Sequence, residues 1–259
     1  TAVHDGRAAG SMLYLDGVSV TFDGYRALNN LSLYIDKGEM RAIIGPNGAG
    51  KTTYFNLISG QLPATSGMVK LNGEDITGHP APRRTRLGLG RAFQLTNLFP
   101  NLSALENVRL AVQVKSGKGY DLFSRTQTHR ELIDRAMDHL AAVSLGDRAQ
   151  AVAATLPHGD QRKLEVAILL ALEPEVFMFD EPTAGMSIDE VPTVLDIIAA
   201  VKKRGDKTIL LVEHKMDVVR SLSDRIVVLH QGKLVADGKP AEVINSDIVR
   251  DAYLGGATA

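Results

Sequence analysis

Gly45-Pro46-Asn47-Gly48-Ala49-Gly50-Lys51-Thr52 is the stretch of sequence that decides the fold of this chain. It fits G-x-x-x-x-G-K-[ST], a pattern in which a glycine-rich turn between a strand and a helix holds phosphate groups. The residues before it, Met40 to Ile44, are typical of a buried strand, and those after it, Thr53 to Ile58, are typical of a helix. A glycine-rich turn without a ligand is the alternative, but it does not account for both flanks. The sequence therefore predicts an α/β fold that binds a nucleoside triphosphate.

The residue types of this loop explain how it would hold phosphate. Glycines lack a Cβ and let successive backbone N–H groups turn inward, and the N-terminus of the following helix adds partial positive charge. Lys51 would reach the β- and γ-phosphates, where it also acts in catalysis, and the Thr52 hydroxyl would bind Mg²⁺. We predict that the ATP-binding set of this loop is Gly45, Pro46, Asn47, Gly48, Ala49, Gly50, Lys51, Thr52 and Thr53.

The 259 residues have the composition of an ordinary globular protein, with 44% apolar and 23% charged residues. A formal net charge of −1 gives no electrostatic reason to expect nucleic acid as a partner. The absence of cysteine excludes disulfides and thiolate metal sites. The longest apolar runs, such as Val166 to Leu172, are too short to span a bilayer. We expect a soluble protein that reaches a membrane only through a partner.

Three regions of the chain differ in their pattern. Residues 1–11 are small, polar and aperiodic, so we expect a disordered leader or a remnant of expression, with Met12 as a natural start. Residues 12–94 and 161–259 alternate strand and helix patterns, whereas residues 95–160 repeat apolar residues at helical spacing. Near-continuous apolar strands between helices indicate a parallel sheet. We predict a P-loop NTPase core with a mainly parallel sheet, an N-terminal antiparallel β subdomain and an inserted helical subdomain.

A pair of carboxylates follows a second buried strand. Asp180-Glu181-Pro182 comes directly after the apolar run Val176 to Phe179. Phosphoryl transfer needs a group that holds the metal and a separate group that places the nucleophile. We predict that Asp180 holds Mg²⁺ through water and that Glu181 activates or orients the attacking water. A strand that ends in a polar turn is the structural alternative.

Taken together, these motifs resemble those of the ATP-binding cassette ATPases, and the resemblance covers nearly the whole chain, residues 13–255. It implies roles for three further residues. Gln94 stands at the Q-loop position, where it would act in catalysis and bind Mg²⁺, and His214 stands at the position of the catalytic switch histidine. Phe22 stands where an aromatic ring would stack on adenine, with Tyr25 as the weaker candidate. A plain surface or packing role is the alternative for each.

Leu156-Pro157-His158-Gly159-Asp160-Gln161-Arg162 stands at the position of the family's signature motif, just before a helix expected over Lys163 to Leu172. The common form, L-S-G-G-Q, has a serine where this chain has Pro157, which offers neither a hydroxyl nor a backbone N–H. Gly159 and the N-terminus of the following helix remain available to phosphate. The resemblance implies that these residues contact ATP held by another subunit: Pro157, His158, Gly159, Asp160 and Gln161. Residues 184–189 similarly match the family's D-loop.

The resemblance implies a head-to-tail dimer with a second ATP-binding subunit, identical or related, and two ATP molecules at the interface. Three segments resemble those of importers of the branched-chain amino acid, amide and urea class: Gly90-Arg91-Ala92-Phe93-Gln94, Leu105 to Val108 and the tail Val243 to Leu254. In such a system the ATPase lies on the cytoplasmic face of the inner membrane beneath permease subunits, and an external solute-binding protein delivers the solute. The alternative is a soluble cassette ATPase not linked to transport. A P-loop kinase or GTPase does not account for Gln94, the signature segment and His214 together.

Overall fold

The computed structural model describes residues 10–92, 98–117, 126–247 and 249. The chain divides into two compact units. The first unit comprises residues 1–89, 175–181 and 204–259, and the second comprises residues 90–174 and 182–203.

The first unit contains an antiparallel sheet built from the N-terminal third of the chain. Strands β1 (Ser11–Phe22) and β2 (Tyr25–Asp36) form a hairpin, and β1 also pairs with β4 (Ser66–Leu71), which turns back into β5 (Glu74–Asp75). The strand order is β2-β1-β4-β5. Buried and exposed residues alternate along much of β2, as expected of a sheet with one face in the core.

A six-stranded sheet carries the loops that matter for function. Its order is β10-β9-β3-β8-β7-β6, and neighbouring strands from β9 through β3 and β8 to β7 are parallel. Its central strands are buried throughout, which explains their continuous apolar runs. The strands are β3 (Met40–Ile44), β6 (Leu89–Ala92), β7 (Val176–Asp180), β8 (Thr208–Val212), β9 (Arg225–His230) and β10 (Lys233–Gly238).

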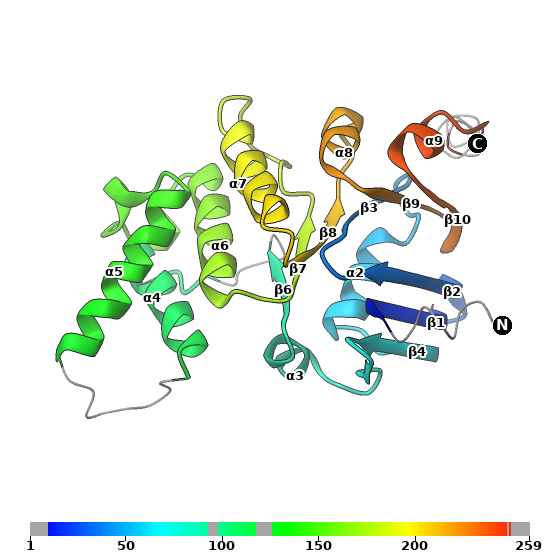
Figure 1. Cartoon of the computed structure of the whole chain (residues 1–259), viewed down its shortest axis with the longest axis horizontal. Coiled ribbons are helices and arrows are strands. Elements are labelled where there is room, and N and C mark those ends of the chain that lie inside the picture. Colours follow the sequence, from blue (N-terminus) through cyan, green and yellow to red (C-terminus); the bar gives the residue numbers. More distant parts are fainter. Residues whose placement is uncertain (1–9, 93–97, 118–125, 248, 250–259) are drawn as a thin grey trace. The chain divides into compact units, whose positions relative to one another are not determined.

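Helix α2 (Lys51–Ser59) packs against both sheets of the first unit (Figure 1). Its Tyr54 and Phe55 are fully buried in one apolar cluster with residues of β1, β4, β8 and β9. The short helices α8 (Met216–Leu222) and α9 (Pro240–Ile244) supply residues to a second cluster with β3 and β9. Helix α3 (Ala81–Arg86) completes the unit.

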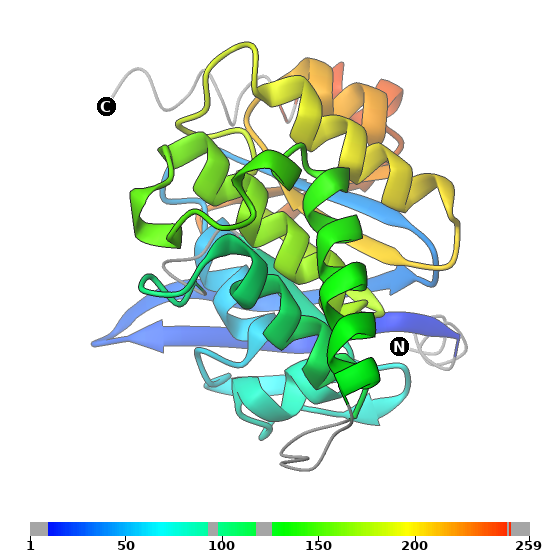
Figure 2. The same cartoon turned by 90° about the vertical axis from the view of Figure 1, so that its left-hand side faces the viewer.

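The second unit is helical. Helices α4 (Ala104–Lys115), α5 (Thr126–Ala142) and α6 (His158–Leu172) contact one another (Figures 1 and 2). Two short 3₁₀ helices, η1 (Gly146–Arg148) and η2 (Ala153–Thr155), lie between α5 and α6 in the sequence, and α7 (Val191–Lys203) follows later.

The predicted fold class is confirmed, since the model contains a mainly parallel sheet, an N-terminal antiparallel sheet and a helical unit. The start of one helix was predicted wrongly. Helix α6 begins at His158 and not at Lys163, so the signature residues form its first turn. Pro157 is tolerated as the N-cap because a proline at a helix start lacks only an N–H that would be unpaired anyway. The domain boundaries at residues 94–95 and 160–161 remain a prediction.

Candidate functional site

The glycine-rich loop joins the end of β3 to the start of α2, and the backbone at Gly50 requires glycine. Gly50 is the N-cap of α2 with a φ of 102°, and a Cβ there would lie 2.8 Å from the carbonyl oxygen of Ala27. A distant turn holds the same loop, because Gly232 donates its N–H to Ala49 O (3.0 Å) and accepts one from Asn29 (2.8 Å). No sequence pattern indicates a role for Gly232, because its contact with the loop is set by the tertiary fold alone.

The Lys51 side chain lines the cavity and is held by the carbonyl groups of its own loop. Its side chain is buried, and Nζ donates to Gly45 O (2.7 Å) and Pro46 O (3.0 Å). Burial lowers the pKa of Lys51, and the negative charges of Glu181 and Asp180 partly oppose this shift. A cation held in this way by two carbonyl groups of the loop itself is placed to bind an incoming anion.

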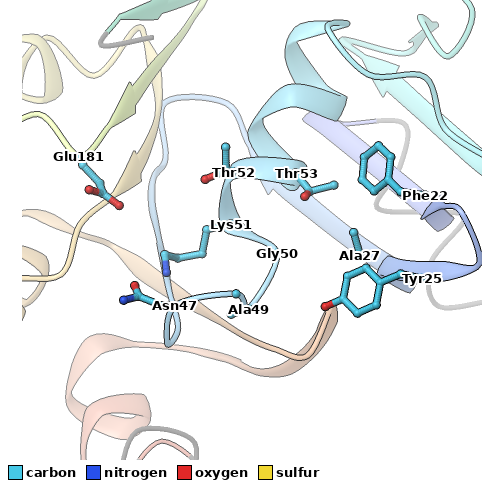
Figure 3. A pocket seen from close by; sticks show the side chains of 11 residues that line it. Phe22, Tyr25, Ala27, Asn47, Ala49, Gly50, Lys51, Thr52, Thr53 and Glu181 are labelled. Carbon is cyan, nitrogen blue, oxygen red and sulfur yellow. The ribbon is translucent and has the colours of Figure 1, made fainter. Parts of the chain in front are cut away.

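A cavity of about 340 Å³ opens in front of the loop. In Figure 3, Phe22 and Tyr25 stand at one end, Glu181 stands at the other, and Lys51 lies between them. Such a cavity can take an aromatic base at one end and phosphates at the other. Its lining comprises Phe22, Tyr25, Ala27, Asn47, Gly48, Ala49, Gly50, Lys51, Thr52, Thr53 and Glu181. The predicted residues Gly45, Pro46 and Asp180 do not line it.

Asp180 and Glu181 lie at the carboxyl end of β7, next to the end of β8. Asp180 is the last residue of its strand and pairs with Val212, and the Glu181 N–H donates to Val212 O (2.9 Å). Glu181 has a φ of 52°, in the left-handed region that residues with a side chain rarely adopt. This conformation costs roughly 1–2 kcal/mol. The backbone turn directs the Glu181 side chain into the cavity (Figure 3).

His214 contacts the predicted catalytic carboxylate. Its Nε2 donates to Glu181 Oε1 at 2.8 Å. The turn that carries His214 is held by buried Glu213, whose Oε2 accepts the backbone N–H groups of His214 (2.7 Å) and Lys215 (3.2 Å). We did not predict a role for Glu213. Its only signal is a carboxylate at the end of an apolar strand, and the sequence does not show that it is buried.

Two further groups of predicted site residues remain. Gln94 lies outside the described residues. Pro157 and residues 158–161 form the start of α6 in the second unit. Within the described parts of the chain, no group of three or more His, Cys, Asp or Glu side chains is placed to hold a metal ion.

Two known protein families match the sequence of this chain. A family model described as "ABC transporter" matches residues 28–184. The chain belongs to the ABC transporter family. A second model, "Branched-chain amino acid ATP-binding cassette transporter", matches residues 233–259 of this ABC cassette.

Two bacterial relatives match nearly the whole cassette. The high-affinity branched-chain amino acid transport ATP-binding protein LivG of Salmonella typhimurium is 39% identical over 253 residues, 95% of this chain and 98% of LivG. The corresponding protein BraF of Pseudomonas aeruginosa is 37% identical over 251 residues, again 95% of this chain and 98% of BraF.

Solved ABC cassettes share the fold. One in its ADP conformation superposes with a TM-score of 0.79 at 26% identity, covering 95% of this chain and 99% of its own. A dimeric cassette in a post-hydrolysis state, bound to ADP and Pi, gives a TM-score of 0.78 at 28% identity over 88% of this chain and 99% of its own. As a cassette of this family, the chain binds ATP and is an ATPase, which confirms the predicted activity. No helix among the described residues has both the length and the apolar character needed to cross a membrane.

Proposed function

We propose that this chain is the ATP-hydrolysing subunit of an importer of branched-chain amino acids or related amides. The observation that carries the proposal is the match of residues 233–259 to the branched-chain amino acid cassette model, beyond the part shared with ABC transporters in general. Relatives over nearly the full length are named as ATP-binding proteins of branched-chain amino acid transport, which supports the same substrate class.

In this proposal ATP binds across the cavity of the first unit. Phe22 stacks on the adenine ring, and the loop from Gly45 to Thr53 surrounds the phosphates with Lys51 on the β- and γ-phosphates. Glu181 orients the attacking water and accepts its proton. His214 holds the Glu181 carboxylate through the 2.8 Å hydrogen bond and then faces the γ-phosphate. The cavity geometry supports these roles, because the aromatic rings of Phe22 and Tyr25 and the Glu181 carboxylate lie on opposite sides of Lys51.

The residues present also suit Mg²⁺. The Thr52 hydroxyl is an oxygen ligand, the kind that Mg²⁺ prefers, and the Asp180 carboxylate would hold the ion through water. Nucleotide sites commonly use only one or two protein ligands with substrate phosphates and water. The absence of a three-residue acidic or histidine cluster among the described residues is compatible with such a site. We therefore assign Mg²⁺ to Thr52 and Asp180, with Gln94 as a further ligand. When bound, the ion would neutralise charge on the β- and γ-phosphates.

The proposal requires partners. A second cassette, of the same or a related kind, would complete each site with its residues 157–161, and permease subunits would hold both cassettes at the cytoplasmic face of the membrane. An external binding protein would supply the solute. ATP binding would then favour the closed dimer, and hydrolysis would reopen it.

The test is uptake of radiolabelled leucine by host cells that lack this chain. Restoring the wild-type chain is expected to restore uptake, and restoring Glu181→Gln is not, because transport then lacks hydrolysis. A tagged chain is expected to co-purify with multi-spanning membrane proteins. Leucine uptake that is unaffected by loss of the chain would contradict this substrate class. Failure to co-purify with any membrane protein would favour a soluble ABC ATPase.

A further inference from the structure

A chain of ion pairs runs from the first turn of α6 to the start of α7 within the second unit. Asp160 Oδ1 accepts a hydrogen bond from Lys163 Nζ at 3.1 Å, and the same Nζ lies 3.9 Å from Glu190 Oε1. The other Asp160 oxygen lies 2.9 Å from an Arg148 Nη1. The side chains of Asp160, Lys163 and Glu190 are 11%, 12% and 26% exposed. Because these charges are largely removed from water, each of them is stabilised by its oppositely charged neighbours.

Glu190 also fixes the turn that precedes α7. Ser187 donates its backbone N–H (3.1 Å) and its hydroxyl (2.9 Å) to Glu190 Oε2, and the Glu190 N–H donates to Ser187 O (3.1 Å). These three hydrogen bonds hold residues 187–190 in a turn directly before α7. The hydrogen bonds from Ser187 lower the pKa of Glu190, so the carboxylate is charged at neutral pH.

Gly159 leaves the space that the Glu190 carboxylate occupies. A Cβ at position 159 would overlap the carboxyl group of Glu190. The carboxylate is the flexible end of its side chain, so it could move away, but it would then leave Ser187. Residues 158 and 185 also lie close together, because a Cβ at Gly185 would lie 3.2 Å from the His158 ring. The signature turn and residues 184–190 therefore pack directly on each other.

We propose that Glu190 is a positioning residue for ATP hydrolysis, which sets Gly159 and residues 184–189 in one fixed arrangement. The proposal rests on the proposed function, in which residues 157–161 act on ATP held by a second subunit. Pro157 supplies no hydroxyl, so the backbone N–H groups of the first turn of α6 take the place of that phosphate contact. The placement of that turn then decides how well the site closes, and Glu190 sets that placement.

The experiment uses the full chain in the form that shows ATPase activity, and it compares Glu190→Ala, Glu190→Gln, Gly159→Ala and the double variant Gly159→Ala/Glu190→Ala. The matched control is Asp206→Asn, an acid whose ion pair with Arg204 (3.1 Å) is half exposed. For each variant, kcat and KM for ATP, the affinity for a non-hydrolysable ATP analogue and the thermal midpoint are measured. Amide hydrogen exchange of residues 184–190 is followed in the isolated chain.

We expect Glu190→Ala to lower kcat by about 10-fold to 100-fold, the scale of a misplaced active-site group, without changing the affinity of the isolated chain for the analogue. Affinity is preserved because the ATP cavity is built from residues of the first unit. Glu190→Gln should retain more activity, since its amide oxygen still accepts from Ser187, and Asp206→Asn should be unchanged. Gly159→Ala should lower kcat similarly and speed exchange of residues 184–190. The double variant should be no worse than Glu190→Ala.

Three results would overturn the inference: normal kcat in Glu190→Ala, additive losses in the double variant, or unchanged exchange of residues 184–190 in Gly159→Ala. The exchange measurement needs no hydrolysis and decides the inference even for a chain that is inactive alone. A wild-type chain whose loss leaves leucine uptake intact would instead contradict the proposed function.

Discussion

Nε2 of His214 lies 2.8 Å from Oε1 of Glu181, although 33 residues separate the two in the sequence. The contact follows from the register of β7 and β8, which pairs Asp180 with Val212 and so places the next residues of both strands at the same sheet edge. The left-handed backbone of Glu181 then turns its side chain across the strand ends. The carboxylate is thus held by an imidazole donor on one side and faces the Lys51 loop on the other (Figure 3).

Glu181→Gln should retain ATP affinity and lower turnover by roughly 100-fold or more, the scale for loss of a positioned base. The amide keeps the shape of the side chain but cannot accept a proton from water. Phosphate release and equilibrium ATP binding measure the two effects separately. Glu175→Gln is the matched control, since that half-exposed acid pairs with Lys207 (2.9 Å) outside the cavity. Normal turnover in Glu181→Gln would remove Glu181 from the mechanism.

His214→Ala should lower turnover by about 10-fold or more while ATP still binds, because Glu181 loses the donor that fixes its carboxylate. If the two side chains act as a unit, the double variant His214→Ala/Glu181→Gln is no slower than Glu181→Gln alone. Lys215→Ala is the control, because its side chain is exposed and the backbone N–H to Glu213 is retained. Fully additive losses in the double variant would show that the two residues act separately.

The sequence predicted those parts of the fold that are encoded locally. The strand before the loop and the helix after it could be predicted because β3 is buried on both faces and α2 begins directly at Lys51. The start of α6 was missed, since the Pro157 and Gly159 pattern normally indicates a break, while here the proline caps the helix.

The supporting contacts of the site could not be predicted because they join distant parts of the chain. Gly232 lies in the turn between β9 and β10 and donates its backbone N–H to Ala49 O. The residues near either one in the sequence do not indicate this hydrogen bond. The burial of Glu213 depends likewise on the packed sheet rather than on its neighbours in the sequence.

Phe22→Ala should weaken ATP binding more than Tyr25→Ala. Both rings line the cavity, but 42% of Phe22 and 63% of Tyr25 is exposed, so Phe22 is better held for stacking. Loss of a stacked aromatic ring costs roughly 1–3 kcal/mol, about 5-fold to 150-fold in affinity. Equilibrium binding of ATP and of inorganic tripolyphosphate separates the base from the phosphates, and tripolyphosphate affinity should not change. A larger effect of Tyr25→Ala on ATP would reverse the assignment of the two rings.

Binding of ATP should be accompanied by proton uptake at Lys51 in alkaline solution. Burial holds the pKa of free Lys51 below the ordinary value of 10.5, and bound phosphates favour the charged form and raise that pKa. Since the complex binds the proton more tightly than the free chain, ATP affinity should fall as the pH rises through the lowered pKa of the free state.

Titration calorimetry in two buffers of different ionisation enthalpy measures this uptake directly. The working pH is alkaline but lies below 10.5, the ordinary pKa of lysine, and is chosen so that the wild-type chain stays folded. Lys51→Ala is the matched variant: it should bind ATP more weakly and show no uptake from this position, because the titrating group is gone. Equal affinity of Lys51→Ala and the wild type would contradict the assignment of the loop. A wild-type heat that is independent of the buffer would show that phosphate does not reach Lys51 as proposed.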